Sequence, residues 1–291
     1  MLRMNLKKMS ALLALITLLS LSVVFSGCGQ KEDAAEGTDN NAEKTELTGS
    51  LTIAGSTSVQ PFSEVLAEEF MAQNPETQIS VQGGGSSQGV AAAVSGAADI
   101  GAASRDLKDE EKTETPELQA IKIAIDGVAI VVNPANGVSD IAIDDVKNIF
   151  TGNITNWSEL GGKDAPITVV CREEGSGTRD AFESIIMEEE PIVASAIIQN
   201  SNGAVRTTVA GDENSIGFVS LAVVNEEIKA LNIDGVEATV DNIKSGTYKV
   251  FRNFNYLVKG EPTGLAKAFI DYVLSAEGQA IIQEEGAITV K

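Results

Sequence analysis

The segment Cys171-Arg-Glu-Glu-Gly-Ser-Gly-Thr-Arg-Asp180 follows directly on the apolar run Ile167–Val170. The apolar run predicts a strand, the two glycines permit an unusual turn, and the next residues predict the start of a helix. The hydroxyls of Ser176 and Thr178, the N–H groups at a helix start and the guanidinium of Arg172 are donors suited to a tetrahedral oxyanion. A plain N-cap beside a surface arginine would use the same residues, so this segment alone leaves both interpretations open.

Two more strand–turn–helix units precede this segment. Leu51 and Ile53 alternate as in a strand and lead into the turn Gly55-Ser-Thr-Ser58, and Ile79–Gln82 leads into Gly83-Gly-Gly-Ser-Ser-Gln-Gly89. The alternation of strands and helices predicts an α/β fold with mainly parallel sheets and flanking helices. Because ligands bind at the carboxyl ends of such strands, we expect the three turns to converge.

The strand pattern also predicts two lobes. Ile121–Ile125 and Val128–Val132 are the most strand-like runs, and Val250–Val258 could return the chain to where it began. We therefore expect a two-lobed fold of the periplasmic-binding-protein type (type II) with two crossover strands. Lobe I would comprise residues 49–128 and 252–291, and lobe II residues 129–251. Such a pair of lobes makes a cleft that can close around a ligand.

The N-terminus predicts export and a lipid anchor. A basic start and an apolar stretch from Ala11 to Phe25 precede the small residues Ser26 and Gly27 and then Cys28. This pattern favours a signal peptide over residues 1–27 and lipidation of Cys28 with palmitate-type acyl chains. The alternative is a permanent membrane helix, because the apolar stretch approaches spanning length.

Residues 28–48 are polar and charged with almost no large apolar side chain, which predicts a disordered tether. A tether behind a lipid anchor places the folded part on the extracytoplasmic face of a cell membrane. By association, such a tethered anchor suggests a Gram-positive cell.

Acidic residues dominate the chain, which has 21 Lys and Arg against 42 Asp and Glu and a formal charge of −21. Removal of residues 1–27 takes away three basic and no acidic residues, which leaves a charge of −24. Nucleic acid is therefore excluded as a partner, because it needs a basic surface. Exposed charges are screened beyond about 8 Å, so an anion site here must rely on short-range donors.

The cysteine and histidine content limits the chemistry further. Cys28 and Cys171 are the only cysteines, so lipidation of Cys28 would leave Cys171 as a lone thiol, which we predict to be buried. The chain has no histidine and therefore lacks the commonest metal ligand and general base. We expect neither a metal nor a cofactor.

Seven short motifs lie in one order from about Leu51 to the C-terminus. They are Gly55-Ser-Thr-Ser58, Gly83-Gly-Gly-Ser-Ser87, Ala98-Asp-Ile-Gly-Ala-Ala-Ser-Arg105, Ile149-Phe-Thr-Gly-Asn-Ile-Thr-Asn-Trp157, Arg172 with Gly175-Ser-Gly-Thr178, Ser215-Ile-Gly-Phe-Val219 and Pro262-Thr-Gly-Leu-Ala-Lys-Ala-Phe269. Together they resemble the phosphate-binding lipoproteins of bacterial phosphate ABC transporters, a periplasmic-binding-protein-like family.

The resemblance implies that phosphate is held by contacts from both lobes. The implied contacts are Thr57, Ser58, Ser86, Ser104, Arg172, Ser176, Gly177 and Thr178, with Ser87 and Arg105 as further candidates.

Two charged neighbours of this set remain open. Glu174 could orient Arg172 by a salt bridge or could lie in solvent. Arg105 could add a second cation or could form a structural ion pair with Asp99 or Asp106.

Ser104 marks a departure from the resemblance. Many members of the family carry an aspartate at this place, where it accepts the proton of phosphate and repels fully ionised sulfate. The Ser104 hydroxyl can accept a hydrogen bond but carries no repelling charge. We therefore expect weaker discrimination of phosphate from sulfate, and another tetrahedral oxyanion such as sulfate is the alternative ligand.

Two other classes of function are disfavoured. Gly85-Ser-Ser-Gln-Gly89 matches the nucleophile motif of serine hydrolases, but the chain has no histidine to serve as its base. A hydrolase or phosphatase is therefore disfavoured, and we expect that the protein is not an enzyme. A surface adhesin would explain the anchor and the acidity but would leave the three donor turns without a purpose.

The sequence thus predicts a lipid-anchored receptor that captures inorganic phosphate between two lobes. The resemblance implies that it delivers phosphate to the permease and ATPase subunits of an ABC transporter.

Overall fold

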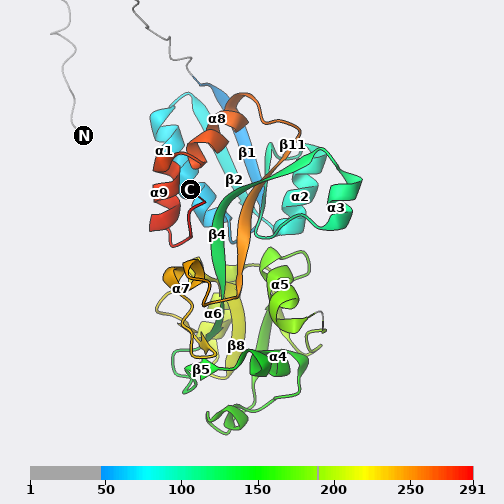
Figure 1. Ribbon diagram of the computed structural model, residues 1–291, viewed down its shortest axis with the longest axis vertical. Coiled ribbons are helices and arrows are strands. Elements are labelled where there is room, and N and C mark those ends of the chain that lie inside the picture. Colours follow the sequence, from blue (N-terminus) through cyan, green and yellow to red (C-terminus); the bar gives the residue numbers. More distant parts are fainter. Residues whose placement is uncertain (1–46, 189, 291) are drawn as a thin grey trace, which may run out of the picture. The chain divides into compact units, whose positions relative to one another are not determined.

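The computed structural model describes residues 47–188 and 190–290 (Figure 1). The predicted signal peptide, the lipidation of Cys28 and nearly all of the predicted tether lie outside the described residues. Within the described ranges, no helix is long and apolar enough to cross a bilayer.

Three strands and the helices between them begin the folded part. They are β1 (Gly49–Gly55), α1 (Gln60–Gln73), β2 (Thr77–Gly83), α2 (Ser86–Ser95) and β3 (Ile100–Ala103). Strands β2, β1 and β3 are parallel neighbours, as the alternation of strands and helices predicted. The turns after β1 and β2 therefore lie at one end of this sheet.

Two long strands cross from this group of elements to the next. They are β4 (Leu118–Val132) and β11 (Phe251–Lys259), which pair antiparallel along the middle of Figure 1. The part of β4 from Val128 to Val132 is completely buried, in keeping with its unbroken apolar sequence. The two strand-like runs expected on either side of Asp126 therefore form one continuous strand.

The middle of the chain forms a second group of elements. Its strands and longer helices are α4 (Ile143–Thr151), β6 (Thr168–Arg172), α5 (Gly177–Phe182), β7 (Ile197–Gln199), α6 (Asn202–Gly211) and β8 (Ser215–Ser220). The smaller elements are α3 (Asp109–Glu114), β5 (Asp140–Ile141), η1 (Trp157–Leu160), η2 (Glu183–Met187), η3 (Leu221–Val223), β9 (Lys229–Ala230), β10 (Asn232–Ile233) and α7 (Val240–Lys244), of which α3 lies before β4. Two helices, α8 (Gly264–Val273) and α9 (Ala276–Glu284), end the chain beside α1.

Nine strands of the described chain form one mixed sheet in the order β2-β1-β3-β11-β4-β8-β6-β7, with β9 also on β4. Parallel pairing holds for β2-β1-β3 and β8-β6-β7, whereas β11 and β4 pair antiparallel with each other and with their neighbours. The expectation of a separate, mainly parallel sheet in each lobe is therefore corrected. The crossing strands β4 and β11 lie between the two parallel groups and join them into one sheet.

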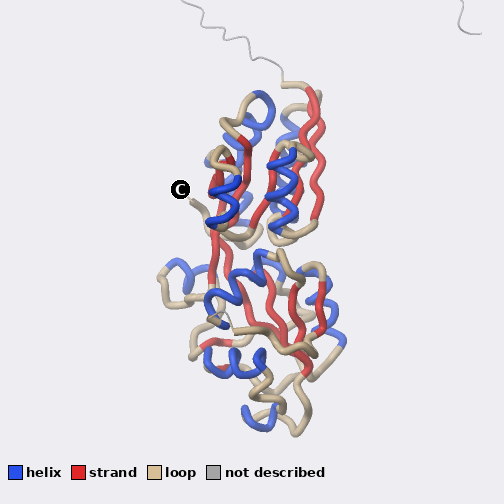
Figure 2. The backbone as a smooth tube through the Cα atoms, turned by 90° about the vertical axis from the view of Figure 1, so that its right-hand side faces the viewer, coloured by secondary structure: helices blue, strands red, loops and turns tan. Residues whose placement is uncertain are grey.

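Two large apolar cores lie on either side of the crossing, and we call the halves built around them lobe I and lobe II. The lobe I core includes Phe62, Phe70 and Phe269, and the lobe II core includes a stack of Phe182 on Phe218. Helices flank the strands in each lobe (Figure 2). Each lobe has its own apolar core, so the polar turns between the lobes are not needed for the core and can bind a ligand.

Candidate functional site

The first contact between the lobes joins two hydroxyls. Ser58, in the turn after β1, and Thr178, in the first turn of α5, lie with Oγ and Oγ1 3.1 Å apart, and both residues are 1% exposed. Asn202, at the start of α6, donates from Nδ2 to Ser58 Oγ at 2.8 Å and to Thr57 Oγ1 at 3.3 Å. Thr57 and Ser58 of lobe I thus meet Thr178 and Asn202 of lobe II.

The second contact brings Ser86, Ser104 and Gly177 together. The N–H of Ser104 donates to Ser86 Oγ at 3.0 Å, and the two hydroxyl oxygens are 3.4 Å apart. A Cβ atom at Gly177 would lie only 2.4 Å from Ser86 Oγ and 2.6 Å from Ser104 Oγ. Only glycine therefore allows the start of α5 to approach these hydroxyls.

The start of α5 is capped from within. Ser176 accepts a hydrogen bond at Oγ from the N–H of Arg179 at 3.3 Å, which fixes the first turn. The first N–H groups of a helix have no acceptor inside it, so those of Gly177 and Thr178 are available to a ligand. Ser176 itself is 1% exposed.

Arg172 lies buried at the end of β6. Its Nε and NH2 donate to the carboxylate of Glu173 at 2.8 and 2.9 Å, and its NH1 has no hydrogen-bond partner in the described chain. Of the two interpretations left open for Glu174, the solvent-exposed carboxylate is confirmed, and Glu173 takes the place beside Arg172. Glu173 continues the pairing with β7 through Gln199, whereas the chain turns at Glu174 and leaves its carboxylate exposed.

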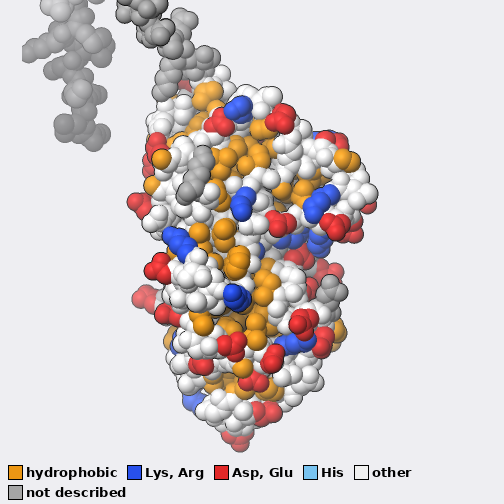
Figure 3. All heavy atoms as spheres, viewed as in Figure 1, with side chains coloured by type: hydrophobic (Ala, Val, Ile, Leu, Met, Phe, Trp, Pro, Cys, Tyr) orange, Lys and Arg blue, Asp and Glu red, His pale blue; other side chains and the backbone are white. Residues whose placement is uncertain are grey.

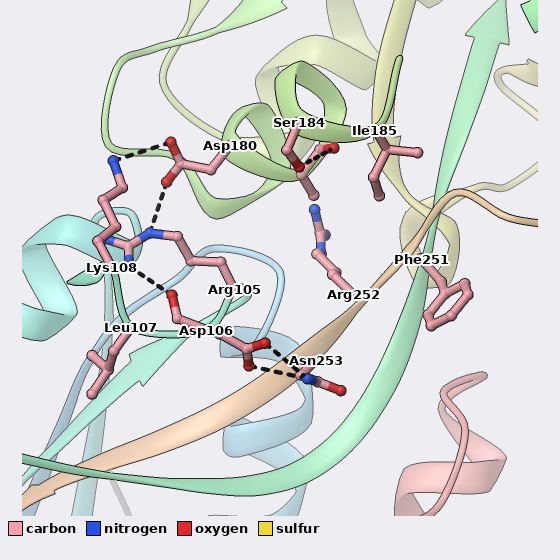
Figure 4. Close-up of a pocket in the computed structure, with 11 residues that line it drawn as sticks. Arg105, Asp106, Leu107, Lys108, Asp180, Ser184, Ile185, Phe251, Arg252 and Asn253 are labelled. Carbon is pink, nitrogen blue, oxygen red and sulfur yellow. Dashed lines mark hydrogen bonds and ion pairs between the residues drawn. The ribbon is translucent and has the colours of Figure 1, made fainter. Parts of the chain in front are cut away.

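Arg105 forms ion pairs with carboxylates from both lobes, so its guanidinium is not free to bind an anion. Its guanidinium contacts Glu111 at 2.7 Å and donates to Ser87 Oγ at 3.2 Å. It also contacts Asp180 of α5 at 2.7 Å (Figure 4). Burial opposes its charge, but Glu111 and Asp180 outweigh that effect and raise the pKa of Arg105. A structural ion pair was one of the two interpretations left open for Arg105, but the partners named for it, Asp99 and Asp106, were wrong. Asp99 accepts instead from the N–H of Thr52, and Asp106 contributes only its backbone oxygen.

A cavity of about 460 Å³ opens beside this ion pair. Arg105, Lys108 and Asp180 line one part of it, and Phe251 and Arg252 of β11 line another (Figure 4). The cavity therefore lies between the lobes, next to the crossing strands.

The crossing strands carry a buried ion pair that was not predicted from the sequence. Asp126 and Arg252 face each other in the register of β4 and β11, and Arg252 NH2 donates to Asp126 Oδ2 and to Ser58 Oγ, each at 2.9 Å. Burial raises the pKa of Asp126, although Arg252 opposes this effect. The available signals were Asp126, between the apolar runs Ile121–Ile125 and Val128–Val132, and Arg252, within the run Val250–Val258.

Asn202 was also missed, and it is 1% exposed. Besides its contacts with Thr57 and Ser58, it accepts at Oδ1 from the N–H of Ser220 at 3.1 Å. Asparagine is common near the start of a helix, so no local pattern distinguishes Asn202 as a contact between the lobes.

Neither the overall surface charge nor the thiol of Cys171 indicates a further function for this site. Acidic and basic side chains lie interspersed on the face in Figure 3, so local donors and not a broad basic surface would attract an anion. Cys171 is buried, as predicted, and burial raises the pKa of its thiol. Among the described residues, no group of three His, Cys, Asp or Glu side chains could hold a metal ion.

Residues 40–277 match the model of a PBP superfamily domain. The chain is 36% identical over 287 residues to the phosphate-binding protein PstS of Bacillus subtilis (strain 168). The aligned residues cover 97% of this chain and 95% of that protein.

Two solved structures are similar over most of the chain. A putative phosphate ABC transporter substrate-binding protein with bound phosphate from Clostridium perfringens is 45% identical, with a TM-score of 0.80 over 84% of this chain and all of that chain. An ABC-type phosphate transport receptor from Vibrio cholerae is 38% identical, with a TM-score of 0.69 over 82% of this chain and 99% of that chain.

Proposed function

Because this chain belongs to the PstS family of the PBP superfamily, we propose that it is the phosphate-binding protein of an ABC-type phosphate transporter. It is a binding protein and not an enzyme. The observation that carries the proposal is the contact of Ser58 with Thr178, and of Ser86 and Ser104 with Gly177, where the lobes meet. The buried Arg172 ends the strand that leads into this turn, and its NH1 has no partner in the described chain.

The chemistry of these groups suits a dehydrated tetrahedral anion. A buried guanidinium N–H without an acceptor is costly, and an anion oxygen would supply that acceptor with a charge-assisted hydrogen bond. In this proposal Thr57, Ser58, Ser86 and Ser104 bind phosphate from lobe I. Arg172, Ser176, Gly177 and Thr178 bind it from lobe II. Glu173 keeps Arg172 oriented from the side away from the anion.

Ser87 and Arg105 take a different part in the proposal. The N–H of Ser87 donates to the carbonyl of Gly175 at 3.0 Å, and Arg105 bridges to Asp180, so both residues connect the lobes. We assign them to closure of the cleft and not to phosphate contact. Binding would then favour the closed form, which the permease and ATPase subunits would recognise.

The place of action follows from the first residues of the sequence. Lipidation of Cys28 would hold the protein at the extracytoplasmic face of the membrane, and residues 28–48 would tether the binding lobes. Two acyl chains would give stable attachment, whereas one would not.

Ligand-induced stabilisation tests the function. Calorimetry and thermal unfolding are measured with phosphate, sulfate, arsenate and molybdate. Phosphate at about 100 times its Kd should stabilise the protein by about 2.7 kcal/mol, which raises the Tm by several degrees. If millimolar phosphate gives neither heat nor a Tm shift while another of these anions does, phosphate is not the ligand.

A further inference from the structure

A second buried guanidinium lies close to the proposed phosphate site. Arg252 is 6% exposed, and its NH2 donates to Ser58 and Asp126, whereas its Nε and NH1 have no hydrogen-bond partner in the described chain. Arg172 also has an unpartnered NH1. Burial, together with the nearby charge of Arg172, lowers the pKa of Arg252 to about 10.

The Asp126 carboxylate does not satisfy Arg252 alone. It accepts from only one of the three guanidinium nitrogens, at 2.9 Å, and a buried ion pair stabilises a fold only when its remaining N–H groups find acceptors. Two buried cations close together also repel each other. An anion with several oxygens between them would remove both costs.

Ser58 connects Arg252 to the rest of the site. A serine hydroxyl has two lone pairs and one proton to donate. Asn202 and Arg252 both donate to Ser58 Oγ, at 2.8 and 2.9 Å, and therefore occupy both lone pairs. The Ser58 proton is left to point toward Thr178 Oγ1, 3.1 Å away, or toward a ligand beside it.

We propose that Arg252 is a second cation of the phosphate site, which donates to the anion through its unpartnered N–H groups and, with Asn202, fixes Ser58 as a donor. Asp126 is then a positioning residue that holds the guanidinium from behind. The inference rests on the proposed function, because the anion is the phosphate of that proposal. It also assigns the second cation to a crossing strand and not to Arg105.

Phosphate calorimetry on three variants and a control tests the proposal. Arg252→Met should weaken phosphate binding by about 30-fold or more, since charge-assisted hydrogen bonds are lost. Arg252→Lys keeps the positive charge but loses the planar set of guanidinium N–H donors. Its phosphate affinity should therefore lie between that of Arg252→Met and that of the wild type. Arg206→Met is the matched control, because Arg206 is partly exposed and pairs with Glu227. It should bind like wild type.

The double variant Asp126→Asn with Arg252→Met separates binding from folding. It removes both buried charges together, so its unfolding without phosphate should return close to wild type. Its phosphate affinity should remain about 30-fold weaker or more. Affinity within threefold of wild type in this variant or in Arg252→Met would overturn the inference, because Arg252 would then be structural. Absence of phosphate binding in the wild type would instead overturn the proposed function, and the inference with it.

Discussion

The hydroxyls of Ser58 and Thr178 lie 3.1 Å apart across the junction of the lobes, although 120 positions separate the residues in the sequence. The N–H of Ser87 donates to Gly175 at the same junction, and Arg105 pairs there with Asp180. The lobes therefore meet through short polar contacts around the proposed phosphate position. Since phosphate oxygens would contact both sides, substitutions that hold the lobes apart should reduce binding even when they remove no donor.

Gly177→Ala tests this close approach. The new Cβ would lie 2.4 Å from Ser86 Oγ and 2.6 Å from Ser104 Oγ, which is closer than atoms can pack. We expect the lobes to stay apart and phosphate affinity to fall by roughly 100-fold, about 2.7 kcal/mol. Calorimetry measures the affinity.

Gly203→Ala is the matched control, because Gly203 also lies in the first turn of a helix but its new Cβ would meet only Ser201 Oγ, at 3.9 Å. It should bind phosphate like wild type and unfold at the same temperature or slightly higher. Wild-type affinity in Gly177→Ala would show that the lobes do not need this contact.

The glutamates that follow Arg172 provide a second test. Glu173→Gln weakens the two hydrogen bonds that fix Arg172, so phosphate binding should lose about 1 kcal/mol. Glu174→Gln changes an exposed carboxylate and should have almost no effect. Calorimetry at one ionic strength compares them. The opposite ranking would mean that Glu174 and not Glu173 orients Arg172 in solution.

The sequence was sufficient for the parts of the site that depend on local patterns. Glycine and serine after an apolar run predict a turn with free donors wherever the strand pairs, so the turns that carry Ser58, Ser86, Ser176 and Thr178 could be placed without tertiary information. The turns after β1 and β2 share one edge because these strands are parallel. The turn after β6 meets them for another reason, since the antiparallel crossing strands make β6 run opposite to β1.

The rest depended on register between distant segments. Asp126 faces Arg252 only because β4 and β11 pair antiparallel in one register, which no local pattern specifies. Glu173 and not Glu174 reaches Arg172 because strand pairing extends one residue beyond β6, through Gln199. The partners of Arg105 were missed for a similar reason, since Asp180 comes from the other lobe.

Ser104 should determine how well sulfate is rejected. The wild-type site has a hydroxyl and not a carboxylate at this position, so sulfate should bind measurably at millimolar concentration near neutral pH. Ser104→Asp should lower sulfate affinity at least 10-fold, because a buried carboxylate repels an anion that carries no proton to share. Ser104→Ala controls for loss of the hydroxyl and should retain sulfate binding. Undetectable sulfate binding by the wild type would contradict the prediction.

The Arg105–Asp180 ion pair should slow the release of phosphate. Asp180→Asn removes the charge that joins α5 to Arg105 in lobe I, so phosphate should dissociate about fivefold faster, with little change in association. Asp109→Asn is the control, because Asp109 forms an exposed ion pair with Lys112 on the same helix of lobe I. Stopped-flow release measures both rates. Equal rates in Asp180→Asn and Asp109→Asn would remove this ion pair from the mechanism of closure.

Glu111 should make the stability of the protein depend on pH. Burial alone would raise the pKa of its carboxyl, but hydrogen bonds from Arg105 and from the N–H of Lys108 outweigh burial and hold the pKa below its ordinary value of 4.5. A carboxyl with a lowered folded-state pKa stabilises the fold fully above the unfolded value. This contribution is lost as the pH falls from about 4.5 through the folded-state pKa.

Glu111→Gln removes the stabilisation that the charged Glu111 carboxylate provides and so tests how this stabilisation depends on pH. At pH 7 its Tm should lie roughly 2–4 °C below wild type, as for the loss of about 1 kcal/mol. The difference should shrink as the pH falls below 4.5, because the wild-type carboxyl then becomes neutral as well. Glu110→Gln changes an exposed neighbour and should leave the Tm unchanged at either pH. A Tm difference for Glu111→Gln that stays constant from pH 7 to pH 3 would mean that packing of the side chain, and not its charge, stabilises Arg105.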